Sequence, residues 1–266
     1  MSALLRIVLA QVEATPDPAT NLDKARHRVA RAAETGAKLV VFPEMFMGLP
    51  AKNRPPALIA TEDDGAFPRG LAALAAQSGL FIVCGGWEVN PAGPRAYNTA
   101  WIMSPSGRMV TAYRKLHLFD ALNRCESETM APGDAPPPVV DIAGVPVGLA
   151  ICYDLRFPEL FRDLARRGAH LVLVPSAWYQ GTMKEAHWLT LLRARAIENT
   201  FYVAGCNLTG VPFSGRSAVF DPFGVPMGDA GETETLLEAE ISLDRLAAVR
   251  RKLPALEHRR LDLFRG

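Results

Sequence analysis

The 266-residue sequence predicts an α/β protein in which helices cover the faces of buried sheet. Three observations lead to this prediction. Several short runs, such as residues 39–42, are continuously apolar and rich in β-branched residues, as strands buried on both faces are. Stretches with helical spacing of apolar residues separate these runs. The alternation occurs once in the first half and again after Cys152, which predicts two α/β layers of similar plan within a single domain spanning residues 1–266.

The first half of the chain opens with an apolar run that suits a central strand, and a helix follows it. Leu22, Ala25, Val29 and Ala32 recur at helical spacing, and Gly36 closes that helix. The turn signal at residues 104–107 joins two strands into a hairpin. The expected elements are a strand at 4–12, a helix at 21–34, a strand at 39–42, a helix at 68–77, a strand at 80–89, and hairpin strands at 96–103 and 108–115.

The second half begins with an irregular segment, residues 116–138, where periodicity fails and three prolines end the stretch. Loops of this length inside a compact domain usually carry function. After them, a hairpin with Ala143-Gly144 as its turn leads into a strand that ends at Cys152. The elements expected next are a helix at 158–168, a strand at 171–174, a helix at 184–199, strands at 201–206, 216–220 and 234–241, with a turn at 221–224, and a short helix from 243 to about 253.

Composition excludes several classes of function. Acidic and basic residues nearly balance, with a formal net charge of +1, which gives no reason to expect nucleic acid or an anionic membrane as partner. No apolar run approaches the ~20 residues that span a bilayer, and residues 1–13 lack a basic leader. Four scattered cysteines without a CxxC pair predict reduced thiols in a cytoplasmic protein. The histidines show no ligand spacing with them, so no metal site is expected.

Three polar residues stand where buried strands are expected to end: Glu44, Lys115 and Cys152. Sites in α/β proteins gather at the carboxyl ends of strands. A turn between Cys152 and a helix start at Pro158 would hold a thiol rigidly beside free backbone N–H groups. Each residue also has an ordinary explanation: a buried cysteine, a solvated turn carboxylate and a lysine extending from an edge strand.

Together, a carboxylate, an ammonium and a thiol predict nucleophilic acyl chemistry. Glu44 would take the thiol proton, because a free thiol with a pKa of about 8.5 is mostly protonated near neutrality. Lys115 would stabilise the thiolate and the oxyanion formed when a carbonyl is attacked. The backbone N–H of Tyr153 would be a second oxyanion donor, and such a donor typically lowers the barrier by ~3 kcal/mol.

Four segments carry a resemblance to a known family. They read LVVFPE at 39–44, YRKLHLFD at 113–120, ICYDLRFPEL at 151–160 and HWLTLLRARAIEN at 187–199. The sequence resembles the carbon–nitrogen hydrolase, or nitrilase, superfamily across nearly its whole length, and is most similar to ω-amidase-like and deaminated-glutathione-amidase-like members. The resemblance implies a four-layer αββα sandwich of the nitrilase type, no metal or organic cofactor, and a homodimer or higher homo-oligomer. A C-terminal tail from about residue 243 would pack on the partner subunit.

The resemblance also maps roles onto residues of this sequence. It implies Glu44 as general base, Lys115 as the lysine and Cys152 as the nucleophile, with a second glutamate in the long loop. Glu126 matches that position better than its competitor Glu128. Four further side chains are expected around the substrate: Arg156, for which a structural salt bridge is the alternative role, Trp178, Tyr179 and His187. His117 is expected to orient the loop, and Arg195 and Glu198 are expected to form an ion pair on one helix.

The function predicted is an amidase that hydrolyses a small linear amide to a carboxylic acid and ammonia through a cysteine thioester. A 2-oxo acid ω-amide such as 2-oxoglutaramate is the favoured substrate. Deaminated glutathione, an N-carbamoyl amine or amino acid, and a nitrile are alternatives that the same three residues would serve. Two other classes compete with an amidase: a non-catalytic binding module, and a thiol redox protein, which lacks a resolving cysteine near Cys152.

Overall fold

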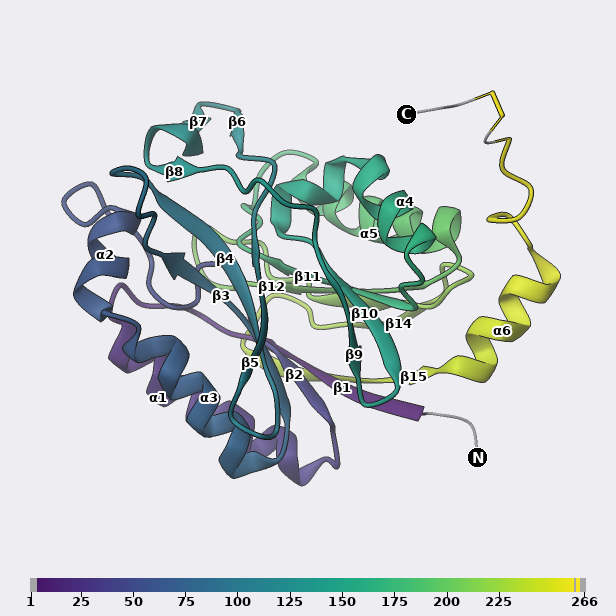
Figure 1. Cartoon of the computed structure of the whole chain (residues 1–266), viewed down its shortest axis with the longest axis horizontal. Coiled ribbons are helices and arrows are strands. Elements are labelled where there is room, and N and C mark those ends of the chain that lie inside the picture. The colour runs from purple at the N-terminus through teal and green to yellow at the C-terminus, as the bar shows by residue number, and fades with distance from the viewer. Residues whose placement is uncertain (1–3, 261, 264–266) are drawn as a thin grey trace.

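The computed structural model describes residues 4–260 and 262–263 of the chain. Two large sheets lie face to face, and helices cover the outer side of each (Figure 1). The four layers follow the order helix, sheet, sheet, helix, so the αββα sandwich predicted from the sequence is confirmed. A two-stranded pair, β6 (Asp120–Ala121) and β7 (Arg124–Cys125), stands apart from both sheets.

The first sheet contains seven strands and is parallel at its centre, where β1, β2 and β3 run together. Three helices cover it. In spatial order the strands are β15 (Thr235–Ser242), β1 (Leu4–Gln11), β2 (Leu39–Val41), β3 (Phe81–Glu88), β4 (Ala96–Met103) and β5 (Met109–Arg114), with β8 (Met130–Ala131) paired to β4. The helices are α1 (Pro18–Glu34), α2 (Pro56–Asp63) and α3 (Ala66–Ser78).

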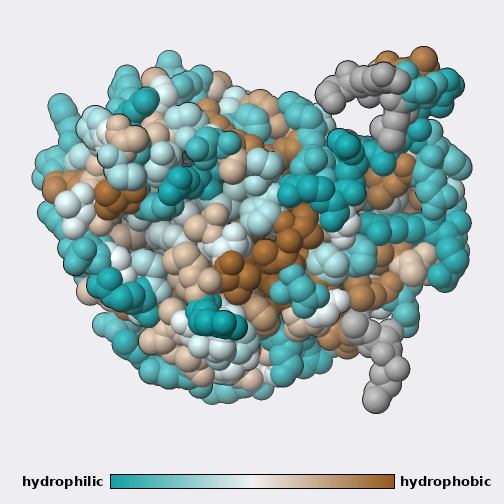
Figure 2. Space-filling view, in the orientation of Figure 1, coloured by the Kyte–Doolittle hydropathy of each residue, from teal (hydrophilic) through white to brown (hydrophobic). Residues whose placement is uncertain are grey.

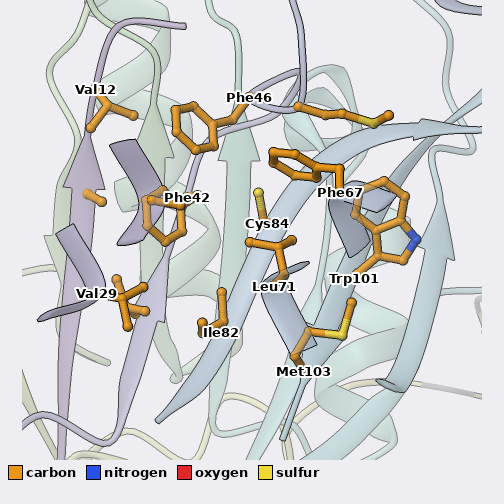
Figure 3. Packing of buried hydrophobic residues seen from close by; sticks show 14 of the residues in the cluster. Val12, Val29, Phe42, Phe46, Phe67, Leu71, Ile82, Cys84, Trp101 and Met103 are labelled. Atoms are coloured by element: carbon orange, nitrogen blue, oxygen red, sulfur yellow. The ribbon is translucent and has the colours of Figure 1, made fainter. Parts of the chain in front are cut away.

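The outer face of the first sheet is closed by apolar side chains from α1, α3 and the strands beneath them. Val29 of α1 and Leu71 of α3 pack with Ile82 of β3 in one cluster (Figure 3). The Asp17 carboxylate accepts a hydrogen bond from the Thr20 N–H at 2.9 Å and so caps the start of α1. Each apolar side chain buried in this cluster contributes roughly 1.5–3 kcal/mol to folding stability relative to an exposed one, so packing holds these helices on the sheet.

The second sheet has six strands and is parallel across β10, β11 and β12. Two helices cover its outer face. The strand order is β14 (Pro226–Asp229), β13 (Ala218–Phe220), β12 (Tyr202–Asn207), β11 (Leu171–Ser176), β10 (Val145–Leu149) and β9 (Val139–Ile142). The helices are α4 (Pro158–Arg166) and α5 (Lys184–Asn199), and α6 (Leu243–Lys252) follows β15.

The continuous apolar runs of the sequence are explained by burial on both faces of each sheet. In β11, Leu171 and Leu173 face the opposite sheet, whereas Val172 and Val174 face the helices. Alternate side chains along a strand point to opposite faces, so a strand covered on both sides needs apolar residues at every position.

The structure departs from the sequence prediction at several elements. Helix α2 and strand β14 were not predicted, and the turn at residues 221–224 joins β13 to β14 within one sheet. The predicted strand at 234–241 lies instead in the other sheet, paired with β1. Alternating patterns identify a strand but not its partner, so this crossover was not readable from the sequence. The segment 116–138 is irregular as predicted, apart from very short strands and one 3-10 turn.

The predicted strand ending at Cys152 stops earlier, at Leu149. The Ile151 N–H donates to the Asp154 carboxylate at 2.9 Å instead of to a neighbouring strand. Cys152 then begins a 3-10 helix, η2 (Cys152–Arg156). The Asp154 carboxylate therefore replaces a neighbouring strand as hydrogen-bond acceptor. This ends the strand pairing and turns the chain just before Cys152.

The surface seen in Figure 2 is hydrophilic around its margin, and hydrophobic residues gather near its centre, in the part of the view where β9 and β10 lie in Figure 1. Two edge strands, β5 and β9, lie on this side of the sandwich. Met109 and Val110 of β5 are exposed. Within residues 4–260 and 262–263, no helix has the length and apolar character required to cross a bilayer.

Candidate active site

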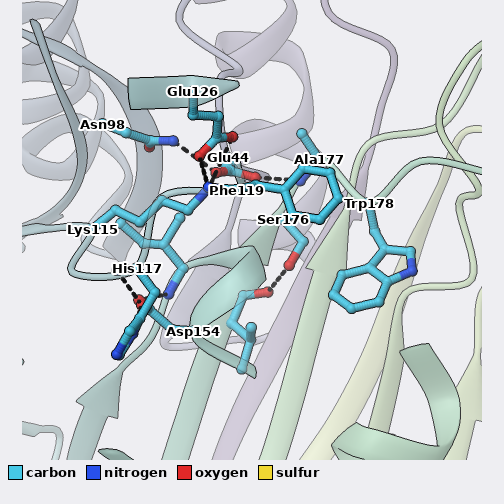
Figure 4. Close-up of polar contacts among 12 residues, drawn as sticks. Glu44, Asn98, Lys115, His117, Phe119, Glu126, Asp154, Ser176, Ala177 and Trp178 are labelled. Carbon is cyan, nitrogen blue, oxygen red and sulfur yellow. Dashed lines mark hydrogen bonds and ion pairs between the residues drawn. The ribbon is translucent and has the colours of Figure 1, made fainter. Parts of the chain in front are cut away.

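Lys115 lies at the centre of a buried charged cluster (Figure 4). It directly follows β5, and its backbone N–H donates to the Asn98 carbonyl at 2.8 Å. Its Nζ donates to Glu44 Oε1 at 2.9 Å and to Glu126 Oε2 at 2.8 Å. Burial alone would lower the pKa of Lys115, but the carboxylates of Glu126 and Glu44 outweigh it and raise the pKa well above its usual value. Lys115 is therefore an ammonium at neutral pH.

Glu44 follows β2 by three residues and is 1% exposed. Its Oε1 accepts from Asn98 Nδ2 at 2.7 Å as well as from Lys115, and its Oε2 accepts from the Ala177 N–H at 2.7 Å. The Glu44 backbone lies in close contact with β3, as a Cβ placed on Gly85 would come within 2.5 Å of Glu44 Cα. Both carboxylate oxygens are thus oriented by donors from three separate segments.

Glu126 belongs to the 3-10 turn η1 (Glu126–Glu128) in the long irregular segment. Its Oε2 also accepts from the Phe119 N–H at 2.9 Å, which links the residues on either side of the β6–β7 pair. Glu126 lines the pocket with Glu44, whereas the competing Glu128 is exposed and does not line it. The structure therefore brings Glu126, and not Glu128, to the cluster.

Cys152 lines the same pocket, half-buried, with a left-handed backbone φ of 45°. Burial and the Glu44 carboxylate raise the pKa of its thiol well above the usual value, although Lys115 and the Ala177 N–H oppose them. The thiol is therefore protonated at neutral pH and needs a base to react. Tyr153 also lines the pocket, in the first turn of η2, where backbone N–H groups lack partners within the helix.

Asp154 fixes this turn against the first sheet. Its buried carboxylate accepts from Tyr113 Oη at 2.8 Å, from the Ile151 N–H at 2.9 Å and from the His117 N–H at 3.1 Å. His117 Nδ1 lies 2.7 Å from the same carboxylate. The orienting role predicted for His117 agrees with this contact. The central part played by Asp154 was not predicted, because nothing in the sequence shows how many donors converge on one carboxylate.

Three of the predicted substrate-contacting side chains lie in the pocket wall: Arg156, Trp178 and Tyr179. The Arg156 guanidinium stands 4.9 Å from the centre of the Trp178 ring. The alternative role for Arg156 is not supported, because no carboxylate lies within ion-pair distance of it among the residues the structure describes. The ion pair between Arg195 and Glu198 is present at 2.9 Å, away from the pocket lining.

The prediction that His187 lines the pocket is wrong. His187 is exposed on α5, whereas its neighbour Trp188 is fully buried against the second sheet. Adjacent helical residues point about 100° apart, so burial of Trp188 turns His187 outward.

Lys184, the first residue of α5, was missed and lines the pocket. Its Nζ stands 4.7 Å from the centre of the Trp178 ring and 5.0 Å from that of Phe119. Burial lowers the pKa of Lys184. The sequence feature that could have identified Lys184 as a pocket residue was its position at the start of a predicted helix, after the end of a strand. Among the described residues, no three His, Cys, Asp or Glu side chains gather in a way that would hold a metal.

Comparison with known proteins places this arrangement in a family. The model of the carbon–nitrogen hydrolase family matches residues 6–251. The chain is 40% identical to deaminated glutathione amidase from Synechocystis sp. over 94% of this chain and 96% of that protein. It is 35% identical to omega-amidase NIT2 from Mus musculus over 97% and 96%, respectively.

A solved structure agrees. A glutamate-to-glutamine mutant of the amidase from Nesterenkonia sp. AN1, with the product of acrylamide Michael addition at its active-site cysteine, matches with a TM-score of 0.84. The two chains are 33% identical over 97% of this chain and 98% of that one. This chain therefore belongs to the carbon–nitrogen hydrolase family of the nitrilase superfamily, and is a hydrolase of carbon–nitrogen bonds other than peptide bonds.

Proposed function

We propose that the protein hydrolyses a small linear amide through a thioester on Cys152. One observation carries the proposal: Glu44, Lys115 and Glu126 form a hydrogen-bonded cluster, and Glu44 and Glu126 line the same pocket as Cys152. Burial and the Glu44 carboxylate hold the pKa of the thiol above its usual value, and the neighbouring carboxylates raise the pKa of Lys115, so a neutral thiol faces a carboxylate with oriented oxygens and an ammonium. That set supplies a nucleophile, a base and electrostatic stabilisation of an oxyanion.

In the first half of the reaction Glu44 takes the thiol proton while Cys152 Sγ bonds to the amide carbonyl carbon. Negative charge moves to the carbonyl oxygen, where Lys115 Nζ and the Tyr153 N–H stabilise it. When the oxyanion collapses, the C–N bond breaks and its electron pair leaves with nitrogen. The nitrogen takes the proton from Glu44, and the acyl group stays on sulfur as a thioester.

In the second half Glu44 takes a proton from water as the water oxygen bonds to the thioester carbonyl carbon. Lys115 and the Tyr153 N–H again stabilise the oxyanion. The C–S bond breaks, the carboxylic acid departs, and the sulfur recovers a proton from Glu44. Glu126 serves by holding the Lys115 ammonium in place through both halves.

The acyl group we propose is that of a 2-oxo acid ω-amide such as 2-oxoglutaramate. Arg156 lies in the pocket wall, packed on Trp178, and offers a cation to a substrate carboxylate. The mouse relative is an omega-amidase and the Synechocystis relative a deaminated glutathione amidase. Deaminated glutathione carries the same 2-oxoglutaryl group on a different amine, so one acyl subsite would serve both substrates. Deaminated glutathione is therefore the second candidate.

Ammonia release from 2-oxoglutaramate tests the function, with deaminated glutathione, N-carbamoyl compounds and nitriles assayed in parallel. We expect the wild-type protein to hydrolyse 2-oxoglutaramate. We expect Cys152→Ala to lose at least about 1,000-fold in kcat while nearly keeping its melting temperature, because the nucleophile is absent and only one partly buried sulfur atom is removed. Hydrolysis by Cys152→Ala, or no hydrolysis of any of these compounds by the wild type, would overturn the proposal.

We further propose that the protein is a cytoplasmic homodimer or higher homo-oligomer whose tail, from about residue 243, packs on the partner. Within its own chain α6 buries Leu246 and Val249, and Arg250 Nε donates to the Thr200 carbonyl at 3.0 Å. The opposite face, with Arg251 and Lys252, is exposed. Four free cysteines suit a reducing compartment. Light scattering of the full chain and of a chain ending at residue 242, which lacks the whole tail, tests the assembly: the full chain should be oligomeric and the truncated chain should dissociate, and a monomeric full chain would refute it.

A further inference from the structure

Asn98, in strand β4, contacts two residues of the charged cluster without lining the pocket (Figure 4). Its side chain is buried, and Nδ2 donates to Glu44 Oε1 at 2.7 Å. Its backbone carbonyl accepts from the Lys115 N–H at 2.8 Å. Strand β4 pairs with β3 on one side and with β5 on the other, so the Asn98 backbone is held in place by the sheet. Asn98 therefore connects Glu44 and Lys115 through one fixed strand.

The two carboxylate oxygens of Glu44 have different donors. Oε1 accepts from Asn98 Nδ2 at 2.7 Å and from Lys115 Nζ at 2.9 Å. Within the described part of the chain, Oε2 accepts only from the Ala177 N–H, at 2.7 Å. A carboxylate oxygen offers two lone-pair positions, so Oε1 is fully occupied and Oε2 keeps one position for a proton. The same Ala177 N–H opposes the rise in the pKa of the Cys152 thiol, so the sulfur and Oε2 share a neighbouring donor.

The orientation of the Asn98 amide destabilises the fold. Its Oδ1 is buried and has no hydrogen-bond partner among the residues that the structure describes. Turning the amide over would place Oδ1 against the negatively charged Glu44 Oε1, so the amide is held with Nδ2 toward the carboxylate. A buried acceptor without a partner is unfavourable, and an apolar side chain of the same shape would avoid it. The donor at this position therefore serves the carboxylate rather than the packing.

We propose that Asn98 is a positioning residue that, together with Lys115, occupies Glu44 Oε1 and so directs the Cys152 proton to Oε2. In that step the S–H bond breaks, an O–H bond forms at Oε2, and the sulfur electron pair bonds to the carbonyl carbon. The leaving nitrogen later takes the proton from the same oxygen. The inference rests on the proposed role of Glu44 as base, and adds to it the oxygen that carries the proton and the residue that selects this oxygen.

The test replaces Asn98 with leucine, which has a similar shape but no donor. With a position open on Oε1, the carboxylate can take the proton on the wrong oxygen, so we expect kcat for 2-oxoglutaramate to fall about tenfold or more. KM should stay within about twofold, because Asn98 does not line the pocket. The melting temperature should stay close to the wild-type value, because the lost bond to Glu44 and the removed unpartnered acceptor have opposite effects.

Asn199→Leu is the matched control. Asn199 is buried as well, its Nδ2 donates to the Arg195 carbonyl at 3.0 Å, and across the described ranges its Oδ1 also has no partner. It ends α5 and lies outside the pocket lining, so Asn199→Leu should keep the wild-type kcat. A wild-type kcat in Asn98→Leu, or an equal loss of kcat in both variants, would overturn the inference.

A thiol titration tests Asn98 without turnover. Asn98→Leu leaves the Glu44 charge less well neutralised, and this charge disfavours the Cys152 thiolate. We expect the pH midpoint for modification of Cys152 by methyl methanethiosulfonate, followed by peptide mass, to rise by about half a unit. In a Glu44→Gln background the same substitution should leave the midpoint unchanged, because Asn98 acts through Glu44. A raised midpoint with no hydrolysis by the wild type would refute the amidase proposal alone, whereas an unchanged midpoint in Asn98→Leu would refute the role of Asn98.

Discussion

At the scale of single residues, the site depends on a protonated thiol surrounded by charges of both signs. Cys152 has Glu44 and Glu126 nearby, which disfavour a thiolate, and Lys115, which favours one. Lys115 Nζ already donates hydrogen bonds to Glu44 Oε1 and to both carboxylate oxygens of Glu126. Its positive charge is therefore shared among these three oxygens. The Cys152 thiol is therefore neutral in the free protein. Glu44 is the group we propose to take its proton when the carbonyl of a substrate binds.

Replacing Glu44, the proposed base, should make the Cys152 thiol ionise more readily. Burial and the Glu44 carboxylate raise the pKa of Cys152, so Glu44→Gln removes one of these causes and lowers that pKa. We expect the pH midpoint for modification of Cys152 by methyl methanethiosulfonate, followed by peptide mass, to fall by about one unit. Glu128→Gln alters an exposed carboxylate outside the pocket lining and should leave the midpoint unchanged. A higher midpoint in Glu44→Gln would contradict the assigned electrostatics.

The residues of the proposed site were predictable from the sequence to different degrees, for physical reasons. Glu44 follows the continuously apolar run 39–42, so its position at the end of a buried strand could be read directly. Lys115 follows a partly exposed edge strand that contains Thr111 and Arg114, so its position was predicted only from the end of the hairpin. Lys184 depends on the path of residues 177–183, which end in a left-handed Met183 with a φ of 60°. No local sequence pattern predicts where this segment places the side chain of Lys184. The prediction for His187 was wrong because packing decides which face of α5 points inward. Burial of Trp188 sets that face, and the local sequence does not show it.

At the scale of elements, backbone contact between neighbouring segments positions Glu44, the proposed base. The stretch from Pro43 to Glu44 lies against β3, where the Gly85 N–H donates to the Pro43 carbonyl at 3.0 Å. A Cβ on Gly85 would come 2.5 Å from Glu44 Cα and 2.8 Å from that carbonyl oxygen. Backbone atoms cannot rotate away as a flexible side chain can, so only glycine permits this approach.

Gly85→Ala should therefore damage catalysis more than folding. The added methyl group must push the Glu44 backbone away, and a displacement near 1 Å in a catalytic group can cost about 100-fold in rate. We expect kcat to fall by about that factor, with a loss of roughly 1–3 kcal/mol in unfolding free energy. Gly93→Ala, where the new Cβ meets only an Asn90 amide nitrogen at 3.9 Å, is the matched control. Activity of Gly85→Ala within twofold of the wild type would show that the close approach does not position Glu44.

At the scale of the whole molecule, the site exists only because the two sheets pack together. The first sheet and its loops supply Glu44, Lys115 and Glu126, and the second supplies Cys152 and the Ala177 N–H. The apolar layer between the sheets joins the two halves, and it contains the buried thiol of Cys206, whose Sγ contacts the Val41 carbonyl at 3.1 Å. The pattern of the sequence predicted two α/β layers and the family resemblance implied the sandwich, but neither predicted the crossover of β15 into the first sheet.

Buried thiols should make stability fall in alkaline solution. Burial raises the pKa of Cys84 well above the usual value, with a smaller contribution from Cys206, and burial also raises the pKa of Cys206. In the unfolded chain both ionise near pH 8.5, so above that pH the folded state binds more protons and the free energy of unfolding falls. Each thiol contributes a slope of up to about 1.4 kcal/mol per pH unit.

Urea denaturation under reducing conditions between pH 9 and 10 measures this slope. Cys84→Ala should reduce it by about 1 kcal/mol per pH unit, whatever the absolute loss of stability from the smaller side chain. Cys125→Ala removes an exposed thiol that meets water in both states, and should keep the wild-type slope. An unchanged slope in Cys84→Ala would mean that its thiol reaches solvent in the folded protein.

The most direct measurement of the central claim is the mass of the protein caught during turnover. Wild-type protein mixed with 2-oxoglutaramate, quenched in acid within milliseconds and digested, should carry a 2-oxoglutaryl group on the peptide that contains Cys152. The group should disappear when substrate is exhausted. Turnover with the acyl group on Cys84, Cys125 or Cys206, or with no acylated cysteine at any time, would contradict a mechanism in which Cys152 attacks the carbonyl.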